Sequence, residues 1–137
     1  MSTQAPTGAK GIKVLVIDDS NTIRRSAEIF LKQGGHEVLL AEDGFDALSK
    51  VNDHDLDLIF CDILMPRLDG YQTCAIIKRN ARFADLPVIM LSSKDGLFDK
   101  ARGRMVGSED YLTKPFTKDQ LLAAVEQYSR VARAHSA

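Results

Sequence analysis

The sequence predicts an α/β fold, in which amphipathic helices cover both faces of a parallel sheet. Its short apolar runs do not alternate with polar residues, which is typical of strands buried on both faces. Helical patterns of apolar spacing lie between these runs, and the connecting loops are short. Right-handed crossovers leave few topologies for five strand–helix units, and the flavodoxin-like strand order 2-1-3-4-5 is the commonest. We therefore expect a (βα)5 three-layer sandwich.

The first unit begins with an apolar run that predicts a buried strand at residues 13–17. A dense group of helix-capping residues follows at 18–21. The helix after them has apolar side chains at i, i+4, i+7 and i+8, and Gly34 and Gly35 end it. The residues expected to face inward are Ile23, Ala27, Phe30 and Leu31.

The second unit is shorter. Residues 37–41 read as a strand, and residues 42–44 as a turn. The helix that follows is expected to fray at residues 52–55, where the apolar spacing stops. Its inward-facing residues are Ala47, Leu48 and Val51.

The third unit contains the stretch around which the chain is organised. An unbroken apolar run at residues 58–61 predicts a strand buried on both faces, and one carboxylate, Asp62, follows it. Pro66 cannot continue a strand ladder, and residues 67–70 supply turn chemistry before a helix with Cys74 and Ile77 on its face. An acid at the carboxyl end of a buried parallel strand stands where such sheets bind their ligands.

The last two units complete the sheet. A strand is predicted at residues 86–91, and a weaker helix at 97–106, interrupted by Gly103 and ended by Gly107. A brief strand at residues 111–112 precedes the final helix. The inward-facing residues of that helix are Leu121, Leu122, Val125 and Tyr128.

The composition is that of an ordinary soluble protein, with 45% hydrophobic and 27% charged residues. A net charge of −1 gives no electrostatic case for binding nucleic acid or a membrane surface. No apolar run approaches the roughly 18 residues of a membrane span, and no signal peptide is visible, so we expect a cytoplasmic protein. Cys61 and Cys74 lie in apolar contexts and are expected to be buried free thiols.

Polar groups suited to a phosphate site follow several of the predicted strands. Asp18 and Asp19 come after the first strand, Asp62 after the third, Ser92 after the fourth and Lys114 after the fifth. Parallel strands end at one edge of the sheet, where three carboxylates would repel one another without a divalent cation. Oxygen ligands favour Mg²⁺, and a carboxylate such as Asp62 can attack a phosphoryl donor.

Each of these residues also has an ordinary explanation. Asp18, Asp19 and Ser20 are suited to capping a helix, which is the commoner role of such a trio. Ser92 could begin a turn, and Lys114 could be a surface lysine. The coincidence of five such groups at equivalent strand ends favours a shared site.

Four motifs, DDS, CDILMPRLDGY, PVIMLSSKD and DYLTKPF, occur in the order found in bacterial response regulators. From about residue 13 to 128 the chain resembles their CheY-like receiver domains. The resemblance implies a receiver domain at 12–133. The small, polar and proline-bearing stretch at 1–11 is expected to be a disordered lead-in, and residues 134–137 a C-terminal tail. The roles that the resemblance implies are phosphoacceptor (Asp62), Mg²⁺ ligands (Asp18, Asp19, Asp62 and the Leu64 carbonyl), switch pair (Ser92 and Tyr111), phosphate-binding lysine (Lys114, before a cis Pro115) and control of the phosphorylated lifetime (Leu64 and Lys94).

Three further stretches of sequence narrow the resemblance to one type of response regulator. NTIRRSAEIFLK, PRLDGYQTCAIIK and LSSKDGLFDKARGRMVGS are similar to the PilG type, the single-domain regulators of chemosensory control of type IV pilus twitching motility. We expect a monomeric, non-enzymatic switch that is phosphorylated by a histidine kinase. Because little sequence follows the last helix, its output is expected to be protein binding through the fourth helix, fifth strand and fifth helix.

Alternative functions are less well supported. An aspartyl-phosphate phosphatase would have its two acids in a DxD motif after the first strand, whereas Asp18 and Asp19 are adjacent. A dinucleotide-binding module is also poorly supported, because no G-x-G-x-x-G motif follows the first strand. A receiver-shaped scaffold that works without phosphate remains an alternative, although the site residues are complete. The three histidines (His36, His54 and His135) and the basic run Lys100, Arg102 and Arg104 are interpreted as solvated side chains.

Overall fold

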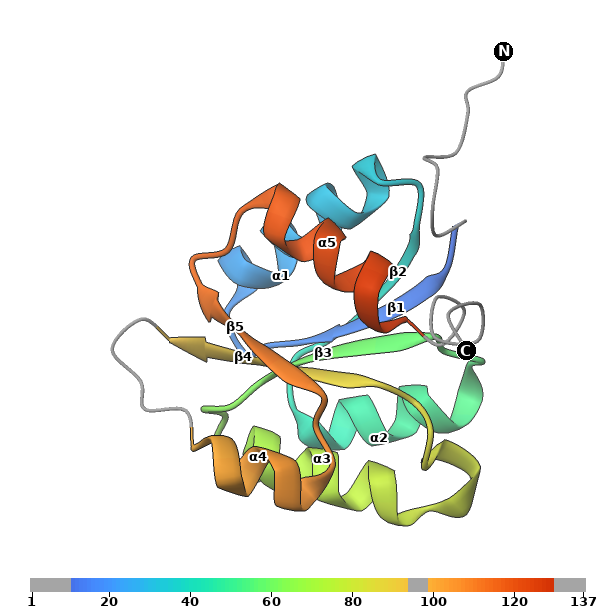
Figure 1. Cartoon of the computed structure of the whole chain (residues 1–137), viewed down its shortest axis with the longest axis vertical. Coiled ribbons are helices and arrows are strands. Elements are labelled where there is room, and N and C mark those ends of the chain that lie inside the picture. Colours follow the sequence, from blue (N-terminus) through green and yellow to red (C-terminus); the bar gives the residue numbers. More distant parts are fainter. Residues whose placement is uncertain (1–10, 94–98, 130–137) are drawn as a thin grey trace.

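Five parallel strands form one sheet, with α1 and α5 on one face and α2, α3 and α4 on the other (Figure 1). The structure is a computed structural model that describes residues 11–93 and 99–129. The strands are β1 (Lys13–Ile17), β2 (Glu37–Ala41), β3 (Leu58–Asp62), β4 (Val88–Ser93) and β5 (Asp110–Lys114). The helices are α1 (Asn21–Gln33), α2 (Gly44–Asp53), α3 (Gly70–Arg79), α4 (Lys100–Val106), α5 (Lys118–Tyr128) and the 3-10 turn η1 (Ala81–Phe83).

The strand order is β2-β1-β3-β4-β5, which confirms the predicted flavodoxin-like topology. β3 occupies the centre, and all five of its residues are buried. Its side chains alternate between two hydrophobic cores: Leu58 and Phe60 pack towards α1 and α5, and Ile59 and Cys61 towards α2 and α3. Full burial of each large apolar side chain contributes about 1.5–3 kcal/mol, so this double coverage fixes the sheet between its helices.

The cysteine prediction is confirmed, because Cys61 and Cys74 are both buried and free. The histidine prediction is wrong for His36. Only 8% of its surface is exposed, and its Nδ1 accepts a hydrogen bond from the backbone N–H of Ile12 at 3.2 Å. Its polar neighbours in sequence concealed this tertiary contact. His135 lies outside the described residues.

Several element boundaries differ from the predictions. β4 extends through Ser93 because its last residues pair with β5. α4 begins at Lys100, where the Asp99 side chain accepts a hydrogen bond from the N–H of Arg102 and caps the helix. Gly103 does not interrupt α4, because it is buried within the helix and keeps its backbone bond to Asp99.

The N-terminal end of α2 also differs from the prediction. Gly44 is the first helical residue and not part of a turn. A side chain at this position would have its Cβ 2.5 Å from Thr73 Oγ1 of α3, so the glycine lets two helices approach closely. Within the described part of the chain, no helix is both long and apolar enough to span a membrane.

Candidate functional site

The carboxyl ends of β1, β3 and β5 bring three charged side chains into contact. Asp18 follows β1, Asp62 ends β3 and Lys114 ends β5. Lys114 Nζ lies 3.1 Å from Asp18 Oδ2 and 3.0 Å from Asp62 Oδ1. These pairs are separated by 96 and 52 residues in sequence, so only the sheet topology makes them neighbours. The side chain of Asp18 is fully buried, and that of Asp62 is 3% exposed.

Local hydrogen bonds fix the position of Asp18. Its Oδ1 accepts a hydrogen bond from the backbone N–H of Ser20 at 2.8 Å, and its carbonyl accepts one from Arg24 Nη1 at 2.6 Å. The cap of α1 is Ser20, whose Oγ accepts from the N–H of Ile23 at 3.3 Å. The capping explanation therefore applies to Ser20, and it leaves the second carboxylate oxygen of Asp18 to Lys114. No sequence pattern indicated the role of Arg24.

The position of Asp62 depends on a close return of the chain. After β3, the backbone turns so that the N–H of Gly70 bonds to the carbonyl of Ile63 at 2.8 Å. A Cβ atom on Gly70 would lie 2.3 Å from the backbone oxygen of Asp62, so only glycine fits here. Asp69 then starts α3 with a capping box to Gln72.

The charges of the cluster shift two pKa values. Burial and then the negative charge of Asp18 raise the pKa of Asp62 from 3.8 to about 7, although Lys114 opposes this shift. Burial acts to lower the pKa of Lys114, but its hydrogen bonds and charge pairing with Asp62 and Asp18 outweigh burial and raise it. Asp62 is thus a carboxylate whose charge the metal-free protein solvates poorly.

The three aspartates could hold a metal ion. Asp18, Asp19 and Asp62 each offer a carboxylate oxygen, and these oxygens lie within 4.8 Å of one another. Asp19 is exposed, whereas the other two are buried. One lysine cannot balance three carboxylates, and an all-oxygen ligand set fits a hard divalent cation such as Mg²⁺.

The remaining predicted site residues lie on β4, on β5 and in the loops after β3 and β5, or outside the described residues. Ser92 is buried at the end of β4, and its hydroxyl donates to the carbonyl of Ser93 at 3.3 Å. Tyr111 is half-buried on β5, where Lys100 Nζ lies 5.8 Å from its ring centroid. Leu64 is 66% exposed. The peptide bond between Lys114 and Pro115 is cis, as expected. Lys94 lies outside the described residues.

A protein-family model matches the same region of the chain. The response regulator receiver domain model covers residues 14–126. The chain belongs to this family. Protein PilG of Pseudomonas aeruginosa is 64% identical over 118 residues, which span 86% of this chain and 87% of PilG.

Other relatives share the domain at lower identity. The alkaline phosphatase synthesis transcriptional regulatory protein PhoP of Bacillus subtilis is 36% identical over 86% of this chain, which spans only 48% of PhoP. Among solved structures, the chemotaxis response regulator CheY4 of Vibrio cholerae is 31% identical, with a TM-score of 0.81 over 87% of this chain and 99% of CheY4. The receiver fold and family are thus independently supported.

Proposed function

We propose that the chain is a stand-alone phosphorylation switch, in which Asp62 accepts a phosphoryl group from a histidine kinase with Mg²⁺ bound. The observation that carries this proposal is the cluster itself. Two buried carboxylates share one lysine at 3.0–3.1 Å, and a third carboxylate completes a cation-binding set. A cluster with an excess of negative charge and one ammonium group suits a dianionic phosphoryl ligand that arrives with a metal ion.

The proposed reaction assigns a task to each residue. A carboxylate oxygen of Asp62 forms a bond to phosphorus while the phosphorus–nitrogen bond of the donor phosphohistidine breaks, and the released imidazole recovers a proton. Asp18, Asp19 and Asp62 would hold Mg²⁺, with the Leu64 carbonyl as a further ligand, and the cation would offset their charge. Lys114, already placed beside Asp62, would bond to a phosphoryl oxygen.

Intact-protein mass spectrometry tests this proposal. Incubation with acetyl phosphate and Mg²⁺ should add the mass of one phosphoryl group, and the addition should vanish in Asp62→Asn but persist in Asp119→Asn, an exposed aspartate on α5. Phosphorylation that survives in Asp62→Asn, or that never occurs in the wild type, would favour a scaffold that works without phosphate. Multiple turnover of a small phosphate ester would instead support a phosphatase.

Metal binding is tested separately. Asp18→Ala and Asp19→Ala should each weaken Mg²⁺ binding and slow the labelling of Asp62, because each removes a carboxylate ligand. Ser20→Ala is the matched control: it removes the cap of α1, which costs about 0.5–2 kcal/mol, and keeps all three carboxylates. Equal losses of Mg²⁺ affinity in all three variants would indicate a folding defect and not a metal site.

The output is proposed to be protein binding through α4, β5 and α5. Phosphate would draw the Ser92 hydroxyl inward, and the half-buried Tyr111 would follow it and change this face. Tyr111→Ala should therefore weaken binding of an effector while Asp62 is still phosphorylated. Chemical shifts that moved only around α1 and α2 on phosphorylation would contradict this route.

The physiological role we propose is chemosensory control of type IV pilus twitching motility. It rests on the 64% identity to PilG over most of both chains. Deletion of the gene should impair twitching on a surface, and the wild-type gene, but not one encoding Asp62→Asn, should restore it. Full restoration by Asp62→Asn would assign the role to the unphosphorylated protein.

A further inference from the structure

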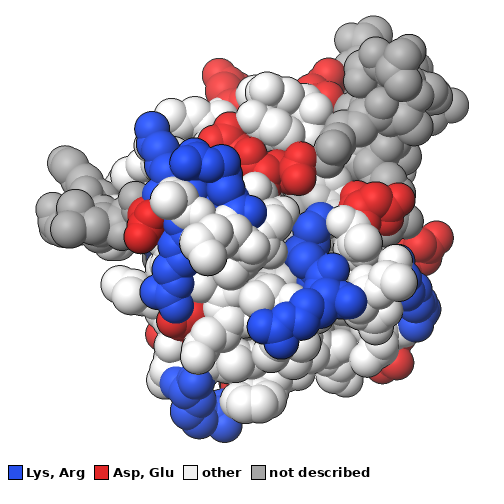
Figure 2. All heavy atoms as spheres, turned by 60° about the horizontal axis from the view of Figure 1, so that its bottom comes forward, with Lys and Arg blue, Asp and Glu red and all other residues white. Residues whose placement is uncertain are grey.

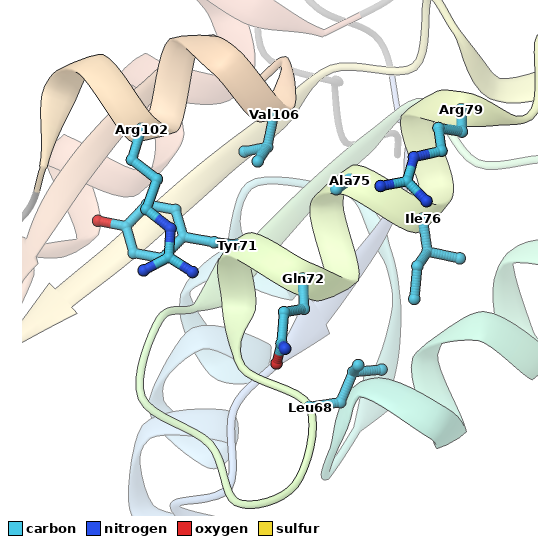
Figure 3. A pocket seen from close by; sticks show the side chains of 8 residues that line it. All are labelled: Leu68, Tyr71, Gln72, Ala75, Ile76, Arg79, Arg102 and Val106. Atoms are coloured by element: carbon cyan, nitrogen blue, oxygen red, sulfur yellow. The ribbon is translucent and has the colours of Figure 1, made fainter.

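A groove runs along α3 on the face of the molecule that carries α2, α3 and α4 (Figure 3). Its volume is about 370 Å³. Ala75, Ile76 and Arg79 line it from α3, and Arg102 and Val106 line it from α4. Ile76 is 41% exposed, although it is a large apolar residue. Side chains spaced i, i+3, i+4 on two neighbouring helices form the kind of surface that receives an amphipathic helix.

The helical residues beside this groove carry only basic charges, and the nearby acids Asp69 and Asp99 lie at the N-caps of α3 and α4. α3, η1 and α4 contain no Asp or Glu, although the whole chain has a net charge of −1. Figure 2 looks onto this side of the molecule and shows Lys and Arg side chains gathered around uncharged surface. The six basic residues of these elements are Lys78, Arg79, Arg82, Lys100, Arg102 and Arg104.

The two arginines that line the groove differ in their surroundings. The guanidinium of Arg102 lies 4.3 Å from the centroid of the Tyr71 ring and 3.8 Å from Asp69 Oδ2, so it is held over one end of the groove. The side chain of Arg79 is exposed and makes no hydrogen bond or ion pair with the described residues. The groove therefore presents an apolar floor between one positioned and one unpaired cation.

We propose that this groove docks an acidic amphipathic helix of a partner protein. Apolar side chains of that helix would cover Ile76 and Val106, and its carboxylates would pair with Arg79 and Arg102. The apolar floor favours a helix over nucleic acid, whose phosphates would need cations in place of the floor. The surface lies on α3 and α4, apart from the aspartate cluster, and it does not depend on phosphorylation of Asp62.

Fluorescence anisotropy with designed helical peptides tests the proposal on the full chain. The probe is an acidic helix with Leu at i, i+3, i+4 and i+7 and Glu beside them. The comparison peptides are a scrambled sequence and a version with Lys in place of Glu. The acidic helix should bind at least tenfold more tightly than either one. Amide chemical shifts should move along α3 and α4 on binding.

Two charge-reversed proteins locate the binding surface. Ile76→Asp with Arg79→Glu should reduce affinity for the acidic helix at least tenfold and should increase affinity for the Lys version. Ile29→Asp with Arg25→Glu is the matched control on α1, because Ile29 is 47% exposed and Arg25 is also exposed. This control should bind the acidic helix as the wild type does.

Three outcomes would overturn the proposal. The acidic helix could bind no more tightly than the scrambled peptide. The α1 control could lose as much affinity as the groove variant. A single-stranded or duplex oligonucleotide could bind the same residues more tightly than the acidic helix, which would assign the basic surface to nucleic acid instead.

Discussion

Replacing Asp62 with asparagine should stabilise the metal-free protein. The side chain of Asp62 is 3% exposed, and its charge is opposed by the neighbouring carboxylate of Asp18. Asparagine has nearly the same shape, and its amide oxygen can still accept the hydrogen bond from Lys114 Nζ at about the 3.0 Å now observed. The substitution therefore removes a poorly solvated charge and keeps the local packing.

The magnitude follows from the pKa of Asp62, which burial and Asp18 raise from 3.8 to about 7. Each pKa unit corresponds to about 1.4 kcal/mol, so the folded protein loses at most about 4 kcal/mol by holding this carboxylate ionised. Solvent around the partly exposed Lys114 screens the cluster, and we therefore expect a gain of about 1–3 kcal/mol for Asp62→Asn at pH 8.

The pH dependence identifies the cause. Below about pH 4 the carboxyl group is protonated in both folded and unfolded chains, so the two proteins should be equally stable there. As pH rises from about 4 to 7, the unfolded chain loses this proton before the folded protein does, and the wild type should lose stability relative to Asp62→Asn. The difference should level off above about pH 8, where Asp62 is ionised in both the folded and the unfolded chain.

Urea unfolding in the presence of EDTA, repeated from pH 4 to pH 8, measures this difference directly. Asp119→Asn is the control, because an exposed aspartate on α5 should show little change. Added Mg²⁺ should narrow the gap by stabilising the wild type more than the variant. A variant that is no more stable than the wild type at pH 8, or a difference independent of pH, would refute the reasoning.

Three further predictions concern other parts of the molecule. Burial lowers the pKa of His36, so the wild-type protein should lose stability as the pH falls below about 6.5. In thermal unfolding, the melting temperature of His36→Asn should fall less than that of the wild type over the same pH range, and equal decreases would contradict this. Gly70→Ala should cost about 1–3 kcal/mol in urea unfolding, because its Cβ would meet a backbone oxygen at 2.3 Å; an unchanged midpoint would show that the loop can move. Neither the leucine nor the lysine side chain at positions 64 and 94 can activate a water molecule, so Leu64→Asn with Lys94→Glu should shorten the lifetime of phosphorylated Asp62. The decay of purified phosphoprotein measures this lifetime. A wild-type lifetime no longer than that of the double variant would contradict the role assigned to these two positions.

The sequence alone determined the fold class, and it predicted that Asp18, Asp62 and Lys114 would meet at one edge of the sheet. Apolar runs such as residues 58–61 are long enough to identify buried strands, and their spacing along the chain limits the topology. The end of β3 could be located within a few residues because Asp62 and Pro66 follow the apolar run, whereas β4 extends past its predicted end because its last residues pair with β5. Family motifs then assigned expected roles to individual residues, which periodicity cannot do.

Only the tertiary structure decided how these residues meet. Lys114 Nζ contacts Asp18 across 96 residues of sequence, and no local pattern encodes such a distance. The same limit explains why the sequence led us to expect a solvated His36, whose hydrogen-bonding partner lies 24 residues away. The groove between α3 and α4 could not be predicted from local sequence patterns for the same reason, because Arg79 and Arg102 belong to separate helices. Sequence periodicity describes what each element buries, whereas packing decides which elements face each other.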